Sequence, residues 1–269
     1  MAVHIDSQWT RKLVAAAAAT SLLCPGLHAG VPLSNDQQLA YARLTAHVDF
    51  VAAVDSTHPL AYYRLNATTG NSRGGETQYK ALGGVTIAKP GAPLNVANNR
   101  FAKLDGRDGY IVTTQAGGIG TTATMMAWVN LAALPSEAKH FFYVMGESQN
   151  GNDLDLQFEG DNALTFSTAS GSHLTFTPPP SALINQWHLI VATMNTVSKT
   201  RVIYWDGDVV ASDKGGGEAK KTSMLSIGES TVFSGRFFNG GIEEAALWNR
   251  ALSADEVSKI YSASQPDAH

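Results

Sequence analysis

The residues best suited to catalysis alternate along one short segment: Asp153, Asp155, Gln157 and Glu159. In a β-strand these four side chains would share one face, with the apolar residues between them on the other. Retaining glycosidases need two carboxyl groups about 5 to 5.5 Å apart. Counted from Asp153, the second carboxyl group should stand at Gln157 or Phe158, and neither is an acid. The alternation therefore predicts an ordinary, half-exposed strand, and we predict no catalytic residue.

Other reactive groups show no catalytic or metal-binding spacing. The eight histidines lack paired metal-ligand spacing, and His188 lies in an apolar run typical of a strand, so it is interpreted as a core or edge residue. The sequence has no Gly-x-Ser-x-Gly elbow, and the glycines at 215–217 precede charged residues rather than a phosphate-binding helix. The single cysteine, Cys24, lies in the N-terminal apolar segment, which excludes a disulfide framework.

The first 29 residues have the layout of a signal peptide. Arg11 and Lys12 precede an apolar run at 13–23 that is too short to span a bilayer, and Pro25, Gly26 and the small residue Ala29 follow. We therefore expect an exported protein, periplasmic or secreted, that is cleaved near Ala29. The chain has 19 basic and 23 acidic residues without a long basic run, which argues against nucleic acid as a partner. No later apolar stretch reaches the length of a transmembrane helix.

Beyond this segment the pattern predicts one all-β domain with a helix at each end. Residues 30–57 form a helical leader, in which Ser34 and Gln37 make a capping box. Short apolar runs separated by turn residues then recur about every ten residues, which predicts a β-sandwich or barrel. Asp206 and Gly207 predict a tight hairpin. Ser253 and Glu256 form a second capping box before a closing helix, and residues 263–269 are a tail.

Taken in order, several of these segments resemble the bacterial laminin-G-like, concanavalin-A-like jelly-roll family. The resemblance covers residues 58–262 and rests on PLAYYRLN at 59–66, FAKLDG at 101–106, YIV at 110–112, TMMAWVN at 124–130, QWHLIV at 186–191, IYWDG at 203–207, LSIG at 225–228 and FNGGIEEAALWNRALSADEV at 238–257. It implies an antiparallel jelly-roll sandwich of two sheets. It also implies a binding or spacer module, often for carbohydrate or for other proteins, and often with structural calcium.

The resemblance gives one candidate metal site. First and last strands commonly lie side by side in this fold, so Asn66 and Glu243 are predicted to meet at a calcium ion (Ca2+). Two positions depart from the family: Ala67 stands where an acidic residue is common, and Glu243 and Glu244 replace an Asp-Glu pair.

Aromatic residues are the natural partners of sugar rings. Tyr62, Tyr79, Tyr143, Tyr204 and Trp205 are candidates for stacking on a sugar. Three other tryptophans lie in strongly apolar segments and are therefore expected in the core: Trp128, Trp187 and Trp248.

The sequence thus predicts a secreted, non-catalytic module that recognises a carbohydrate or an extracellular or cell-surface protein. The alternatives are a glycan-cleaving enzyme on the same fold and a structural spacer of the cell envelope. The residues of the ligand-binding surface are not specified by the sequence, because sugar specificity lies in loops.

Overall fold

The computed structural model describes residues 34–73, 77–92, 99–116, 122–147, 154–168, 173–215 and 224–265. The predicted signal peptide lies outside the described residues. The chain divides into two compact units, Met1–Leu39 and Ala40–His269. Helix α2 (Asn35–Ser56) begins in the first unit and ends in the second, and everything below concerns the second unit. None of the described helices is long and apolar enough to cross a membrane.

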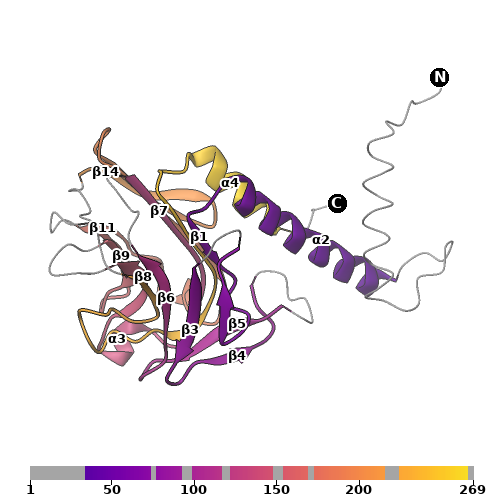
Figure 1. Cartoon of the computed structure of the whole chain (residues 1–269), viewed down its shortest axis with the longest axis horizontal. Coiled ribbons are helices and arrows are strands. Elements are labelled where there is room, and N and C mark those ends of the chain that lie inside the picture. The colour runs from indigo at the N-terminus through magenta and orange to yellow at the C-terminus, as the bar shows by residue number, and fades with distance from the viewer. Residues whose placement is uncertain are drawn as a thin grey trace. The chain divides into compact units, whose positions relative to one another are not determined.

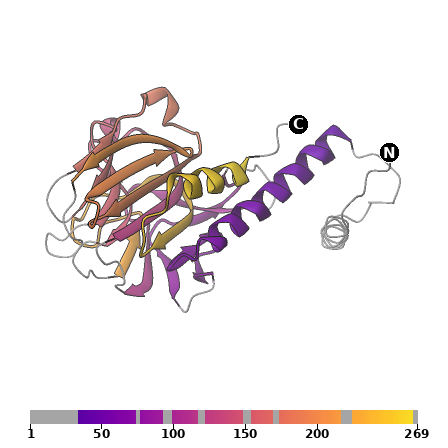
Figure 2. The same ribbon diagram turned by 90° about the horizontal axis from the view of Figure 1, so that it is seen from above.

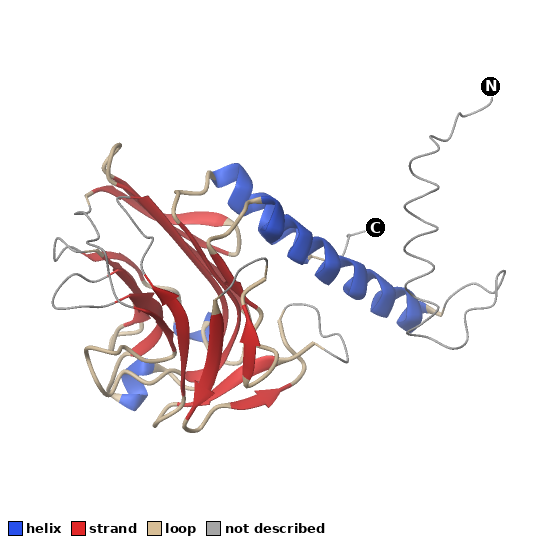
Figure 3. Cartoon of the chain, in the orientation of Figure 1, coloured by secondary structure: helices blue, strands red, loops and turns tan. Residues whose placement is uncertain are grey.

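The domain is built from two antiparallel sheets, as Figures 1 and 3 show. Strand β1 (Ala61–Tyr63) pairs with β16 in the sheet here called sheet A. The remaining strands of sheet A follow in the spatial order β14 (Asp208–Lys214), β13 (Thr200–Trp205), β12 (His188–Asn195), β7 (Thr122–Leu131), β16 (Asn239–Trp248), β5 (Phe101–Asp105) and β4 (Thr86–Ala88).

The second sheet, here called sheet B, also has eight strands among the described residues. Their spatial order is β11 (His173–Phe176), β10 (Leu164–Ser167), β9 (Leu154–Phe158), β8 (Phe142–Glu147), β15 (Met224–Ile227), β6 (Tyr110–Ala116), β3 (Gln78–Leu82) and β2 (Thr69–Asn71). Neighbours in space are often distant in the sequence, which is the expected topology of a jelly roll. The fold predicted from the sequence is confirmed.

The main core lies between the two sheets. Alternate residues of each strand point inward, so Leu156 and Phe166 of sheet B meet Ile190 and Leu247 of sheet A in one buried cluster. Burying large apolar side chains between two sheets supplies most of the stabilisation that a sandwich without disulfides requires.

Sheet A has a second apolar layer on its outer face. The end of α2 contributes Phe50 and Val54, and α4 (Ala254–Ser264) contributes Val257 and Ile260. These side chains pack on the outward-facing residues of sheet A: Tyr62, Met126, Trp128, Leu189, Val191, Tyr204, Ala246 and Trp248. Figure 2 shows both helices on this side of the sheet. The core positions predicted for Trp128 and Trp248 are confirmed, whereas Trp187 is only half-buried.

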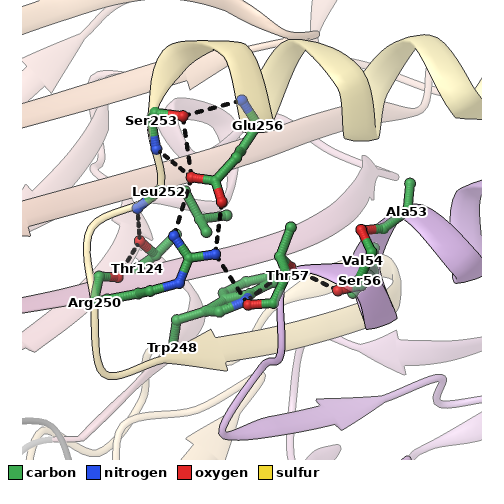
Figure 4. Close-up of polar contacts among 10 residues, drawn as sticks. All are labelled: Ala53, Val54, Ser56, Thr57, Thr124, Trp248, Arg250, Leu252, Ser253 and Glu256. Atoms are coloured by element: carbon green, nitrogen blue, oxygen red, sulfur yellow. Dashed lines mark hydrogen bonds and ion pairs between the residues drawn. The ribbon is translucent and has the colours of Figure 1, made fainter.

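The two helices are tied to the last strand by a polar joint, drawn in Figure 4. The indole Nε1 of Trp248 donates to Thr57 Oγ1 at 3.0 Å, just after α2. The guanidinium of Arg250 donates to the Thr57 carbonyl at 3.0 Å and to both oxygens of Glu256 at 3.0 and 2.7 Å. Thr124 Oγ1 joins β7 to the same turn by donating to the Arg250 carbonyl.

The local features predicted from the sequence are present. Both capping boxes form, with Ser34 bonded to Gln37 and Ser253 bonded to Glu256. Asp206 and Gly207 have φ values of 52° and 86°, as a two-residue hairpin with positive φ requires. Two short helices, α3 (Pro135–Ala138) and the 3-10 turn η1 (Pro180–Ala182), connect strands and had no predicted counterpart.

Candidate functional site

The outer face of sheet B carries mainly polar side chains. In β9, Leu156 and Phe158 point into the core, so Asp155 and Gln157 point outward. The prediction of a half-exposed strand is nevertheless wrong, because Asp155 is 1% and Gln157 3% exposed. Neighbouring strands and connections cover both side chains, and a polar group that is buried in this way needs hydrogen-bond partners. Asp153 lies outside the described residues.

A depression of about 520 Å³ lies at one end of this face, next to the edge of sheet B, and is here called the sheet B pocket. It is lined by Phe141, Glu159, Gly160, Asp161, Ala163, Thr165, His173, Thr175 and Thr177. The lining combines hydroxyl groups, two carboxylates and an imidazole with one aromatic ring. This combination suits a small, hydroxyl-rich ligand better than an apolar one.

Strand register explains why the pocket forms. Thr165 stands opposite Thr175 on one side and opposite Gln157 on the other, so the three share the outer face. In the next row outward the small side chain of Ala163 lies beside Glu159, whose backbone N–H donates to the Ala163 carbonyl. A small residue flanked by longer side chains leaves a hollow in the surface of the sheet.

The floor of the pocket holds a hydroxyl group without a partner among the described residues. Thr165 is 0% exposed, and its Oγ1 makes no hydrogen bond within the described part of the chain. An unsatisfied buried hydroxyl costs about 1–3 kcal/mol. A ligand that displaces the atoms covering this oxygen, and then donates to it or accepts from it, would recover that free energy.

One wall of the pocket is fixed by a chain of polar contacts. The guanidinium of Arg236 lies over the rings of Phe141 and Phe233, at 4.7 and 4.4 Å from their centroids. It donates to Gln157 Oε1 at 2.8 Å, and Gln157 Nε2 donates to Glu159 Oε1 at 3.1 Å. Glu159 is therefore held in place by a side chain that is itself immobilised by burial. Gln157 stands where a glycosidase would need a carboxylate, and here its amide positions Glu159.

A serine and a histidine also meet on this face but are not arranged for hydrolysis. Ser167 Oγ lies 2.9 Å from His173 Nδ1, and Asp155 stands opposite Ser167 in the neighbouring strand. A catalytic triad places the histidine between the serine and the acid, whereas here the serine lies between the other two residues. Ser167 is also only 3% exposed.

The predicted metal ligands lie at the opposite sheet. Asn66 is exposed after β1, and Glu243 is fully buried in β16. Glu243 Oε1 accepts from the amide Nδ2 of Asn99 at 3.4 Å, while its Oε2 has no hydrogen-bond partner among the described residues. Gly91 packs tightly here, because a Cβ at this position would lie 2.3 Å from Glu243 Oε2.

These residues do not by themselves fit calcium. Calcium takes six to eight oxygen ligands. Asn99 presents its amide nitrogen, and the neighbouring Glu244 is engaged by Tyr62 Oη and Arg64 Nε. No cluster of three or more His, Cys, Asp or Glu ligands occurs within the described ranges. The calcium site at Asn66 and Glu243 stays a prediction.

Among the described aromatic residues, those proposed for sugar stacking lie elsewhere. Tyr62, Tyr79, Tyr143 and Tyr204 are buried, and Trp205 packs against the core with its ring 4.3 Å from that of His188. The aromatic residue of the pocket is Phe141, which sequence reasoning missed. The sequence did contain a signal for the threonines of the pocket. Leu-Thr-Phe occurs at both 164–166 and 174–176, and it places Thr165 and Thr175 on one face of two paired strands.

Solved structures with this fold include a domain that was determined in complex with a carbohydrate. Domain 4 of the extracellular arabinanase AbnA from Geobacillus stearothermophilus, solved with arabinotriose, is 14% identical, with a TM-score of 0.58 over 76% of this chain and 98% of that one. A botulinum neurotoxin type C structure, described as showing dependence of cell entry on two ganglioside molecules, is 13% identical, with a TM-score of 0.59 over 80% of this chain.

The binding domain of botulinum neurotoxin DC, in complex with SialylT, is 14% identical, with a TM-score of 0.56 over 77% of this chain. The chain spans about half the length of these toxin chains, 53% and 52% respectively. At such identities the likeness concerns the fold. No curated protein sequence matched the chain.

A family model gives the identity of the domain directly. It matches residues 105–258, from the end of β5 into helix α4, which is more than half of the chain. The matched stretch includes every strand that forms the sheet B pocket, together with β16 and the turn that follows it. The chain belongs to the concanavalin A-like lectin/glucanases superfamily, in its laminin-G-like branch.

Proposed function

We propose that this protein is an exported, non-catalytic module that binds a carbohydrate in the sheet B pocket. The observation that carries the proposal is the hydroxyl of Thr165, buried in the floor of the pocket and without a partner among the described residues. Sugars present hydroxyl groups that both donate and accept hydrogen bonds, so a sugar that displaces the atoms covering this oxygen can satisfy it.

The other lining groups support the same ligand class. Glu159 and Asp161, which carry carboxylates, and Thr175 and Thr177, which carry hydroxyls, line the same pocket as Thr165. The ring of Phe141 offers a face for the C–H groups of a sugar ring. The arabinotriose complex of a domain with this fold supports the proposal, since 98% of that domain is covered by the likeness.

The carboxylates do not favour an enzyme. A glycosidase needs one acid to protonate the leaving group and another to act as nucleophile or base, and the pair must flank the bond that is cleaved. Each carboxylate here has one oxygen held by its own hairpin or strand: Glu159 by Gln157, and Asp161 by the backbone N–H of Ala163 at 3.0 Å. Both serve better as fixed acceptors for sugar hydroxyls.

A test of binding begins with a glycan array, followed by calorimetry on the best ligand. Thr165→Val removes the hydroxyl while keeping the shape. We expect it to weaken binding at least about tenfold, and to leave the melting temperature unchanged or higher because an unsatisfied polar group has been removed. Thr122→Val, at the start of β7 in sheet A and outside the pocket lining, is the matched control.

Three outcomes would refute the proposal. An array without any bound glycan, or full affinity in Thr165→Val, would show that the pocket is not a carbohydrate site. Release of reducing ends from the bound glycan would show that the protein is an enzyme.

The first alternative function is binding to an extracellular protein, and the second is that of a structural spacer. Both alternative functions predict that no glycan on the array is bound.

The proposed export is tested by fractionating cells of the native host and locating the mature chain. Recovery of the uncleaved chain from the cytoplasm would contradict the export.

A further inference from the structure

We infer that the sheet B pocket selects uncharged or amino-bearing sugars and rejects sugars that carry a carboxylate or sulfate. The inference rests on the proposed carbohydrate function and concerns the class of sugar. It follows from the charges around the Thr165 hydroxyl and from the way in which they are fixed.

The first step is the charge of the lining. Glu159 and Asp161 both belong to the β9–β10 turn, and His173 is the only other titratable side chain among the described lining residues. The lining residues that the structure describes include no lysine or arginine. Its formal charge is therefore negative, whether or not the imidazole of His173 carries a proton.

The second step is that these charges are held in place. Glu159 Oε1 accepts from Gln157 at 3.1 Å, and Asp161 Oδ1 accepts from the Ala163 backbone at 3.0 Å. Neither carboxylate can swing away from an incoming anion without losing a hydrogen bond. Fixed like charges that face a ligand are a repulsive element, and specificity between similar ligands often depends on such an element.

The third step concerns Arg236, a positive charge that lies beside the pocket. The guanidinium of Arg236 lies over the rings of Phe141 and Phe233 and donates to Gln157. The guanidinium is thus engaged by the two rings and by Gln157, and Arg236 is not among the described lining residues. The sequence between β8 and β9 (148–153) and between β10 and β11 (169–172) adds no lysine or arginine.

Like charges a few ångströms apart repel one another even in water, so the two carboxylates should together disfavour an acidic sugar about tenfold. This preference should shrink at high salt, because the pocket is open to solvent and its charges are screened there.

The experiment compares matched glycans that differ by one acidic group, such as lactose with 3′-sialyllactose and galactotriose with trigalacturonic acid, on an array that also carries arabinan and chitosan oligomers. We expect the bound glycans to be neutral or amino-bearing, and their acidic counterparts to bind about tenfold more weakly. The double variant Glu159→Gln with Asp161→Asn keeps the shape of both side chains and should remove that difference.

Glu137→Gln, at an exposed carboxylate of α3 outside the lining, is the control and should keep the difference. Acidic and neutral members bound equally by the wild type, with both lost in Thr165→Val, would overturn the inference and leave the carbohydrate function standing. An empty array would remove the proposed function and the inference with it.

Discussion

Glu243 and Glu244 follow each other at a β-bulge of β16, and both carboxylates are buried, at 0% and 2% exposure. In a regular strand one of the two would face the opposite side of the sheet. The φ of 54° at Glu244 allows both to lie on the outer side of sheet A. Glu244 has a counter-charge there, Arg64, at 3.0 Å, whereas Glu243 accepts hydrogen bonds from two neutral groups of the described chain, the amide of Asn99 and the backbone of Ala92.

The first prediction is that Glu243→Gln stabilises the protein at neutral pH by about 1–3 kcal/mol. Burial, together with the charge of Glu244, raises the pKa of Glu243 well above 4.5. The folded protein therefore binds this proton more tightly than the unfolded chain does. The stability that Glu243 contributes is present below pH 4.5 and is lost as the pH rises through the folded pKa.

Thermal unfolding of Glu243→Gln and wild type across this range measures the effect, and the gain should vanish toward low pH. Glu244→Gln is the matched control with the opposite expectation, because it removes the partner of Arg64 and should destabilise the protein. Equal melting curves for Glu243→Gln and wild type at neutral pH would contradict the prediction.

The second prediction concerns binding of calcium at Glu243. A calcium ion on Asn66 and Glu243, as expected from the sequence, requires the melting temperature of the wild type to rise with calcium and fall with a chelator. Glu243→Gln and Asn66→Ala should both lose this response. A melting temperature that is the same in calcium and in chelator would remove the metal site.

The third prediction concerns the joint between α4 and the last strand. Hydrogen bonds from Arg250 lower the pKa of Glu256 from 4.5 to about 2. The stabilising contribution of Glu256 is thus present above pH 4.5 and is lost as the pH falls through about 2. Glu256→Gln keeps the capping box but loses the charge. Because solvent screens this ion pair, the substitution should lower the free energy of unfolding by only about 1 kcal/mol at neutral pH.

Chemical denaturation at several pH values measures the free energy of unfolding of Glu256→Gln and of the wild type. The difference between the two should disappear near pH 2. Asp255→Asn, an exposed neighbour in the same helical turn, should show a smaller and flatter effect. A cost that does not change between neutral and acidic pH would show that the ion pair contributes nothing.

The fourth prediction concerns the wall of the sheet B pocket. Arg236→Lys keeps a positive charge but loses the planar group that lies over Phe141 and Phe233 and reaches Gln157. Gln157 then no longer holds Glu159 in place, so glycan affinity should fall about tenfold. The free energy of unfolding should change by about 1 kcal/mol. Calorimetry measures the affinity, and Arg107→Lys, on an exposed loop, is the control. Unchanged affinity in Arg236→Lys would show that the wall does not position Glu159.

The sequence by itself determined the parts of this protein that depend on neighbours along the chain. Alternating apolar residues predicted the strands, Asp206 and Gly207 predicted their hairpin, and Ser253 with Glu256 predicted the start of α4, because pleat, turn and helix cap are set within a few residues. The order of such segments also identified the jelly roll.

Only the tertiary structure decided which of these residues meet. Asp155 and Gln157 alternate as an exposed face should, yet the fold buries them. Phe141, Thr165 and His173 come from three different strands or turns, and Arg236 reaches Gln157 from a distant loop, so the pocket depends on strand order and register across sheet B. Contacts between strands that are far apart in sequence leave no periodic pattern along the chain, which is why the strand pattern could be predicted and the site could not.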